Sequence, residues 1–141
     1  MGQISKWFSY DEFSCTCDCN SMFEVDKKLL HALDKARDEC GPLIISSGHR
    51  CSAKNKSVGG AQASWHLLRG GILHAADVVI AKRTDRTFRN TLKLYVALDG
   101  AHAQGLGLYP SWVHADMRPN QRARWVDSRV DWTSRGNGRR R

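Results

Sequence analysis

The chain has 141 residues, of which 41% are hydrophobic and 26% are charged. This length and composition indicate one domain with a packed core, and they exclude an extensively disordered chain. Lys and Arg outnumber Asp and Glu by 22 to 14, which gives a net charge of +8. Such a charge favours encounters with polyanions, including nucleic acid, anionic lipid and bacterial walls, but does not choose among them.

The hydropathy pattern predicts neither a membrane span nor a secretory signal. No run approaches the roughly 18 apolar residues that a transmembrane helix needs. The first residues, MGQISKW, lack the apolar centre of a signal peptide. We therefore expect synthesis in the cytoplasm, with any work outside the cell depending on release by another factor.

The first half of the chain predicts a turn, a helix and a strand. Residues 9–13 are typical of a short capped turn. Apolar residues recur at helical spacing over 23–39, and Gly41 and Pro42 follow as breakers, so an amphipathic helix is expected there. Residues 43–46 then predict a short buried strand.

The second half predicts a glycine loop at 58–61, a core strand at 75–80, a helix at 87–97 and a strand at 112–116. This order of elements is typical of an α+β domain with helices packed on one sheet. We place a single domain at residues 1–125 and a basic, frayed tail at 126–141.

Five cysteines give an odd count, and three of them alternate as Cys15, Cys17 and Cys19. A zinc ribbon usually needs two Cys-x-x-Cys knuckles, which this sequence lacks. Reduced thiols, or one disulfide formed after release, are therefore favoured over a second metal site.

Three polar residues are difficult to explain by packing. His66 follows a glycine-rich loop, Asp77 adjoins a run of apolar residues, and His114 lies within a predicted strand. A buried carboxylate is costly unless it is paired, hydrogen-bonded or bound to metal. Two imidazoles and a carboxylate form a known catalytic zinc set that leaves a fourth position open. Taken singly, a His or Asp of this kind is more often an ordinary hydrogen-bonded structural group, and composition and spacing together favour neither that interpretation nor a metal site.

Several ordered motifs resemble the zinc D-Ala-D-Ala carboxypeptidases of peptidase family M15, in particular the short phage and bacterial branch. They are SSGHRC at 46–51, VGGA at 58–61, SWH at 64–66, AADV at 75–78, GLGLYP at 105–110 and WVHADMR at 112–118. The similarity runs from about residue 8 to residue 125. It implies an α+β, hedgehog/DD-peptidase-like fold in which helices pack on a small, mainly antiparallel sheet.

The resemblance also implies roles for individual residues. His66, Asp77 and His114 would bind one zinc ion. Arg50 would bind a substrate carbonyl or carboxylate, for which its planar, permanently charged fork is suited. Ser64 would line the substrate site and order its loop rather than act as a nucleophile.

Three departures from the family pattern concern the site. The His and Asp ligands are usually seven positions apart, but here His66 and Asp77 are eleven apart, which predicts an enlarged loop and makes His74 an alternative ligand. Ser111 stands where many relatives have an acidic general base, so Asp116 becomes the candidate base, with a structural bond to Arg118 as its alternative. His49 replaces a common tyrosine and is expected to line the cleft, where an imidazole titrating near pH 6.5 could assist proton transfer.

These features imply a monomeric zinc metallopeptidase acting on peptidoglycan stem peptides or cross-links, as a carboxypeptidase or as a lysis or virion-associated endopeptidase. The alternative within the same fold is a zinc-containing wall-binding module without turnover. A nucleic-acid binder is disfavoured, because basic residues are spread along the chain and no nucleic-acid motif is present.

Overall fold

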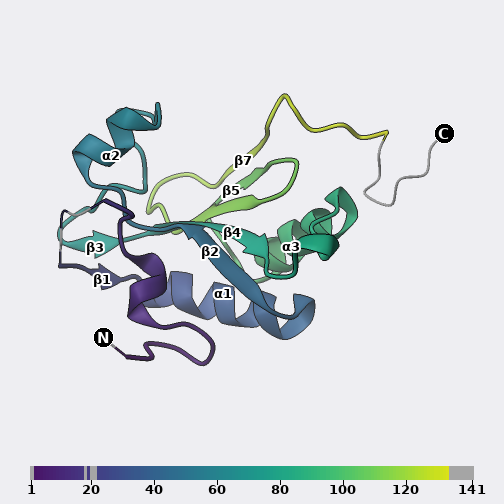
Figure 1. The fold of residues 1–141 in the computed structure, drawn as a ribbon, viewed down its shortest axis with the longest axis horizontal. Coiled ribbons are helices and arrows are strands. Elements are labelled where there is room, and N and C mark those ends of the chain that lie inside the picture. The colour runs from purple at the N-terminus through teal and green to yellow at the C-terminus, as the bar shows by residue number, and fades with distance from the viewer. Residues whose placement is uncertain (1, 18, 20–21, 134–141) are drawn as a thin grey trace.

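The computed structural model describes residues 2–17, 19 and 22–133. Three α-helices, two short 3-10 helices and seven strands follow one another along this part of the chain (Figure 1). In order they are η1 (Tyr10–Phe13), β1 (Glu24–Val25), α1 (Lys27–Cys40), β2 (Leu43–Ser47), α2 (Ser52–Ser57), β3 (Ile72–Leu73), β4 (Ala75–Ile80), η2 (Arg83–Asp85), α3 (Phe88–Gly100), β5 (Gly105–Leu108), β6 (Val113–Asp116) and β7 (Ala123–Val126).

Five strands form the main sheet in the order β2-β4-β6-β5-β7, and β1 pairs with β3 in a separate small sheet. All neighbours in the main sheet are antiparallel except β5 and β7. Helices α1 and α3 pack against each other, while α2 lies away from them (Figure 1). The predicted α+β class with a mainly antiparallel sheet is confirmed.

Helix α1 begins four residues later than predicted. Asp26 caps it, because its carboxylate accepts a hydrogen bond from the Lys28 amide at 2.8 Å. The preceding residues are extended as β1, and the Phe23 ring stacks on Tyr10 with ring centroids 4.7 Å apart. Phe23 lies at helical spacing from the apolar residues of α1 but is not part of the helix. The residues that follow it pair with β3 instead. The helix ends at Cys40, and Gly41 caps it with a φ of 83°, which suits glycine.

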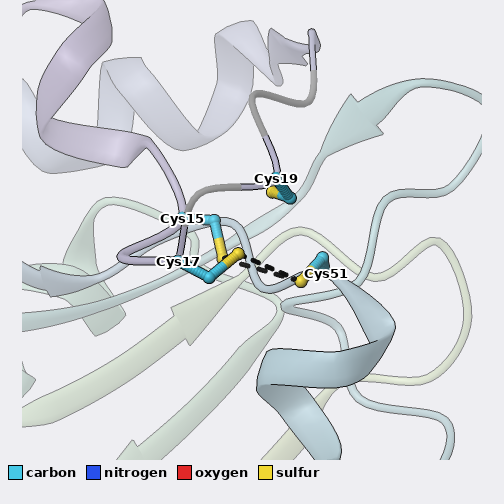
Figure 2. A group of neighbouring side chains, drawn as sticks. All are labelled: Cys15, Cys17, Cys19 and Cys51. Carbon is cyan, nitrogen blue, oxygen red and sulfur yellow. Dashed lines mark hydrogen bonds between the residues drawn. The ribbon is translucent and has the colours of Figure 1, made fainter.

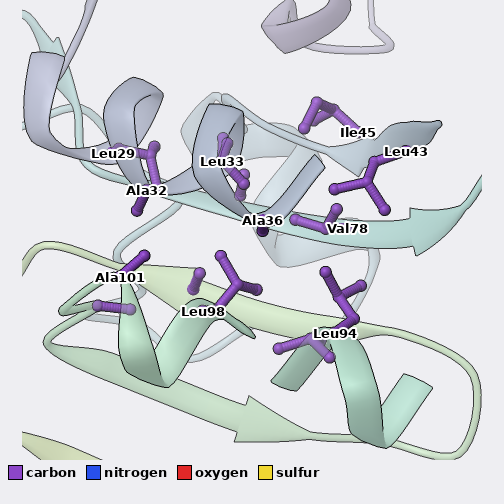
Figure 3. Packing of buried hydrophobic residues seen from close by; sticks show 14 of the residues in the cluster. Leu29, Ala32, Leu33, Ala36, Leu43, Ile45, Val78, Leu94, Leu98 and Ala101 are labelled. Carbon is purple, nitrogen blue, oxygen red and sulfur yellow. The ribbon is translucent and has the colours of Figure 1, made fainter. Parts of the chain in front are cut away.

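The core lies between the two long helices and one face of the sheet (Figure 3). In β4, Ala76, Val78 and Ile80 belong to this core, and in β6 Val113 and Ala115 do. Because successive side chains of a strand point to opposite faces, the residues between them point away from the helices. The sheet thus has one apolar face against α1 and α3 and one face available for polar chemistry.

Packing contacts continue past residue 125, where the sequence placed the start of a tail. Strand β7 extends to Val126, and the Trp132 ring packs edge-on against Phe88, with centroids 5.4 Å apart. The remainder of the predicted tail, residues 134–141, lies outside the described residues. None of the helices in the described part of the chain has the length and apolar character needed to cross a bilayer.

Candidate metal centre

Strand register brings two of the predicted ligands together. Asp77 in β4 is the direct antiparallel partner of His114 in β6. Both occupy alternate positions to core residues, so both side chains stand on the sheet face opposite the helices. Directly opposed residues have Cβ atoms only about 5 Å apart. Strand pairing alone therefore places a carboxylate and an imidazole side by side.

The third side chain, His66, comes from the loop between α2 and β3 and converges on the same carboxylate. Its Nε2 lies 3.3 Å from Asp77 Oδ1, and His114 Nδ1 lies 3.1 Å from that oxygen. The ligand atoms of all three residues lie within 4.8 Å of one another. The side chains of His66, Asp77 and His114 are only 4%, 13% and 10% exposed. This buried, convergent donor set fits a divalent metal ion.

The backbone fixes His66 in the orientation that a ligand requires. Its Nδ1 lies 2.8 Å from the Gly48 carbonyl oxygen, so the ring donates its Nδ1 proton there and its Nε2 is directed at Asp77. The His66 amide donates to Ser64 Oγ at 3.1 Å. Ser64 thus orders this loop, as expected from the sequence, and it also lines the neighbouring pocket.

Electrostatics within the cluster favour a bound cation. Burial acts to raise the pKa of Asp77, but hydrogen bonds from His114 and His66 hold it well below its ordinary value. Burial also acts to lower the pKa of His114, yet hydrogen bonds to Asp116 and Asp77 raise it to about 9. A positive charge is therefore stabilised between these carboxylates, and a metal ion would displace the proton that otherwise supplies it.

Asp116 lies on the opposite side of the His114 ring from Asp77. Its Oδ2 is 2.7 Å from His114 Nε2, while Arg118 donates to both carboxylate oxygens at 2.8 and 2.7 Å. The Asp116 side chain is fully buried. These contacts favour the structural alternative over the role of general base, because the imidazole separates the carboxylate from the convergence point. Asp116 is placed to orient His114 as a ligand.

Replacing Asp116 with asparagine separates these two roles. If Asp116 orients His114, Asp116→Asn should weaken zinc binding about 10- to 100-fold, and saturating zinc should restore most of the activity. Zinc titration combined with peptidase assays at limiting and saturating metal would measure both effects. Asp127→Asn is the matched control, because Asp127 pairs with Arg129 in the same Asp-x-Arg arrangement on the surface. A variant that binds zinc normally but turns over slowly at every zinc concentration would instead identify Asp116 as the base.

Arg50 reaches the cluster from the segment that follows β2. Its Nη2 lies 3.5 Å from Asp77 Oδ2, and the guanidinium also donates to Ser47 and Asn55 at 3.2 and 3.3 Å. The Arg50 amide donates to the His66 carbonyl at 2.9 Å, which ties the two segments together. The guanidinium therefore lies beside the three candidate ligands, and its role in substrate binding stays a prediction.

A pocket of about 440 Å³ opens over the cluster, and aromatic side chains form much of its wall. Tyr109 and Trp112 stack with centroids 4.5 Å apart, and Trp125 donates from Nε1 to the Tyr109 hydroxyl at 3.1 Å. The sequence motifs contained Tyr109 and Trp112, but the role of these aromatics as pocket walls was not predicted. Gly107 was an available signal, because a Cβ there would collide with the Trp125 ring.

Two other histidines lie away from the convergence point. His49 is buried against the Phe23 ring and borders a different pocket, together with Asp11 and Glu12. Burial lowers its pKa, and its Nδ1 has no hydrogen-bond partner in the described part of the chain. The expected place of His49 in the cleft is therefore not supported by the geometry. His74 contacts Asp26 at 2.7 Å, so this alternative ligand is engaged elsewhere.

The enlarged spacing between His66 and Asp77 is accommodated by a tight turn. Arg69 and Ile72 form an antiparallel bridge around Gly70 and Gly71, whose φ values are 63° and 78°. Two successive residues with positive φ are typical of a type I′ turn, which glycine adopts without strain. The extra residues form β3, which pairs with β1. They therefore do not disturb the pairing of Asp77 with His114.

In a comparison with protein families, a family model described as Peptidase M15 matches residues 6–116. The matched region contains all three members of the cluster and Arg50. Comparison with curated proteins and with solved structures gave no match.

Proposed function

The chain belongs to the peptidase M15 family, and from this membership we propose that it is a zinc-dependent enzyme that hydrolyses peptide bonds in bacterial peptidoglycan. Family membership and the His66, Asp77 and His114 cluster support a metallopeptidase in general. The substrate, the ion and the bond that is cut are our proposal. The observation that carries it is the convergence of two imidazoles on one buried carboxylate beneath an open pocket.

Zinc is the ion that best suits this donor set. Nitrogen and carboxylate ligands at three positions, with the pocket on the remaining side, are typical of catalytic zinc sites. When bound, the ion would act as a Lewis acid that polarises the substrate carbonyl and lowers the pKa of water.

The residues of the chain itself would bind and orient the substrate. Arg50 borders the pocket and would donate hydrogen bonds to the carbonyl oxygen as it gains charge, or to a terminal carboxylate. Trp65, Tyr109, Trp112 and Trp125 would hold the peptide on apolar surfaces and restrict the access of bulk water. Arg118 lies between this pocket and a larger one beyond Trp65, which leaves room for a substrate that continues past the scissile bond.

The net charge of +8 supports a cell-wall substrate, because an anionic wall would concentrate a cationic enzyme at its surface. We propose that the enzyme acts as a monomer on the wall after release from the cytoplasm, or as a virion-associated or lysis protein. These alternatives differ in where the enzyme reaches the wall, and the proposed chemistry of the site is the same in each.

Digestion of purified peptidoglycan tests the proposal directly. Mass spectrometry of soluble fragments should show newly formed peptide termini after incubation with the full chain. A chelator should abolish these products and added zinc should restore them, because the ion supplies the Lewis acid. Release of the terminal D-Ala as a free amino acid would identify a carboxypeptidase. Separation of stem peptides that were cross-linked would identify an endopeptidase. Intact fragments with the zinc-loaded chain would reject the proposed substrate.

A second candidate is a non-catalytic, zinc-containing module that binds the wall. One observation favours it: among the described residues, Asp77 is the one carboxylate that borders the metal pocket, and Ser111 occupies the usual acidic position. Sedimentation with peptidoglycan in the absence of any cleavage product would support this module. Zinc-restored cleavage would exclude it.

A further inference from the structure

Four cysteine sulfur atoms gather at a second place, separate from the cluster of His66, Asp77 and His114. Cys15, Cys17 and Cys19 come from the segment after η1, and Cys51 precedes α2 (Figure 2). Their sulfur atoms all lie within 4.8 Å of one another. We propose that these four cysteines bind a second, structural zinc ion.

The spacing of the sulfur atoms suits a single shared centre. A tetrahedral zinc site with Zn–S bonds of about 2.3 Å has sulfur atoms about 3.8 Å apart. Cys15 and Cys51 are separated by 3.9 Å, and Cys17 lies 3.0 Å from Cys15 and 3.2 Å from Cys51. All three separations exceed the roughly 2.05 Å of a disulfide bond. To bind a shared zinc ion, the Cys17 sulfur atom would need to move only slightly away from the sulfur atoms of Cys15 and Cys51.

The chemistry of the donors selects the ion. Four cysteine thiolates form a soft ligand set, which favours zinc over calcium, magnesium or manganese. The Lys54 amide donates to Cys51 Sγ at 3.4 Å, a contact that would stabilise a metal-bound thiolate. This donor set differs from the His-Asp-His cluster, so the two sites can be distinguished by spectroscopy.

The protein backbone brings the two cysteine-bearing segments together without help from the sulfur atoms. The His49 amide donates to the Phe13 carbonyl at 2.8 Å. Gly48 allows this approach, because a Cβ there would collide with the Phe13 backbone. Cys15 and Cys51 each follow this contact by two residues. The site is therefore largely preformed, which reduces the entropy lost on binding the ion.

Disulfide bonds account less well for the same arrangement. Only one of Cys15, Cys17 and Cys19 can form a disulfide with Cys51. If all four cysteines were in disulfides, the other two would bond to each other across only one or three intervening residues. A shared ion uses all four sulfur atoms at once and needs no such short loop. The sequence favoured thiols or a single disulfide because it did not show that Cys51 joins the alternating cysteines.

Metal stoichiometry of the full chain tests this site. Protein purified under reducing conditions without chelator should contain two zinc ions per chain by elemental analysis. The His66→Ala/His114→Ala double variant should retain one ion. Cobalt substituted into that variant should show the intense thiolate-to-metal charge-transfer absorption of cysteine ligation. The single ion retained by the double variant and its charge-transfer absorption depend neither on the histidine cluster nor on peptidase activity, so failure of the proposed function would not affect them.

Cysteine variants assign the ligands. Cys17→Ser in the double-histidine background should lose the charge-transfer band and the remaining zinc, whereas Cys40→Ser should lose neither, because Cys40 lies at the end of α1 outside the cluster. Should Cys17→Ser fail to fold, titration of the histidine variant with a thiol-specific mercurial provides the same information: it should release one zinc ion. Reduced, folded protein that binds zinc only at the histidine site, or a cobalt form without thiolate bands, would overturn the proposal.

Discussion

Replacing His66 or His114 with alanine is expected to abolish zinc binding at the His-Asp-His cluster and peptide cleavage together. Each imidazole supplies one of three ligand atoms gathered within 4.8 Å, so its loss leaves two protein ligands. We expect cleavage to fall by more than about 10³-fold, because losing a single oxyanion donor already costs about 10²–10³ and the ion supplies more than one donor does. Elemental analysis and fragment mass spectrometry on the same preparations would measure both losses.

The core that supports the sheet should survive these substitutions. The apolar residues of α1, α3 and the helix-facing side of the sheet do not include the ligands. Far-ultraviolet circular dichroism should therefore match that of the unsubstituted chain. Lys35→Ala is the control, because Lys35 is an exposed residue on α1 that borders neither the metal pocket nor the larger pocket beyond Trp65. Cleavage that persists in a folded His114→Ala variant would refute the metal centre as the catalytic site.

Arg50→Ala is expected to reduce kcat/KM by about 10²–10³ while the zinc content stays unchanged. The guanidinium lies 3.5 Å from Asp77 and borders the pocket, so it is within reach of a substrate carbonyl or carboxylate near the ligands. Arg50→Lys should recover only part of the loss, because an ammonium group keeps the charge but not the planar pair of donors. Steady-state kinetics on a defined stem peptide would give both parameters.

The distribution of the Arg50 effect between kcat and KM identifies what the guanidinium binds. A fall in kcat would assign it to charge that develops during the reaction, and a rise in KM alone would assign it to a carboxylate of the bound substrate. Arg89→Ala is a suitable control, because Arg89 is an exposed arginine on α3. Unchanged kinetics in Arg50→Ala would exclude Arg50 from the site.

The sequence was sufficient for features that depend on local pattern. The strand at 75–80 matches β4, and the strand at 112–116 contains β6, because short runs rich in apolar and β-branched residues are typical of buried strands. The two long helices, α1 and α3, were also found, with errors at their ends. Helix α2, a six-residue element without an apolar periodicity, was missed.

The candidate ligands were identified by residue type and by resemblance, but their convergence was not visible in the sequence. Asp77 and His114 are 37 positions apart, and only the antiparallel register of β4 and β6 makes them direct neighbours. The role of Asp116 shows the same limit. Its proximity in sequence to His114 suggested a base, whereas the ring of His114 separates it from Asp77 in the fold.

Local sequence thus determined the kinds of elements, the basic charge and the candidate donors, since these depend on residue identity and short-range periodicity. Tertiary structure decided which donors meet: Cys51 joins three cysteines more than thirty positions away, while His74 turns to Asp26. The physical reason is that a binding site requires atoms within a few ångströms of one another. Strand register and loop closure set those distances, and neither is specified by any short stretch of the chain.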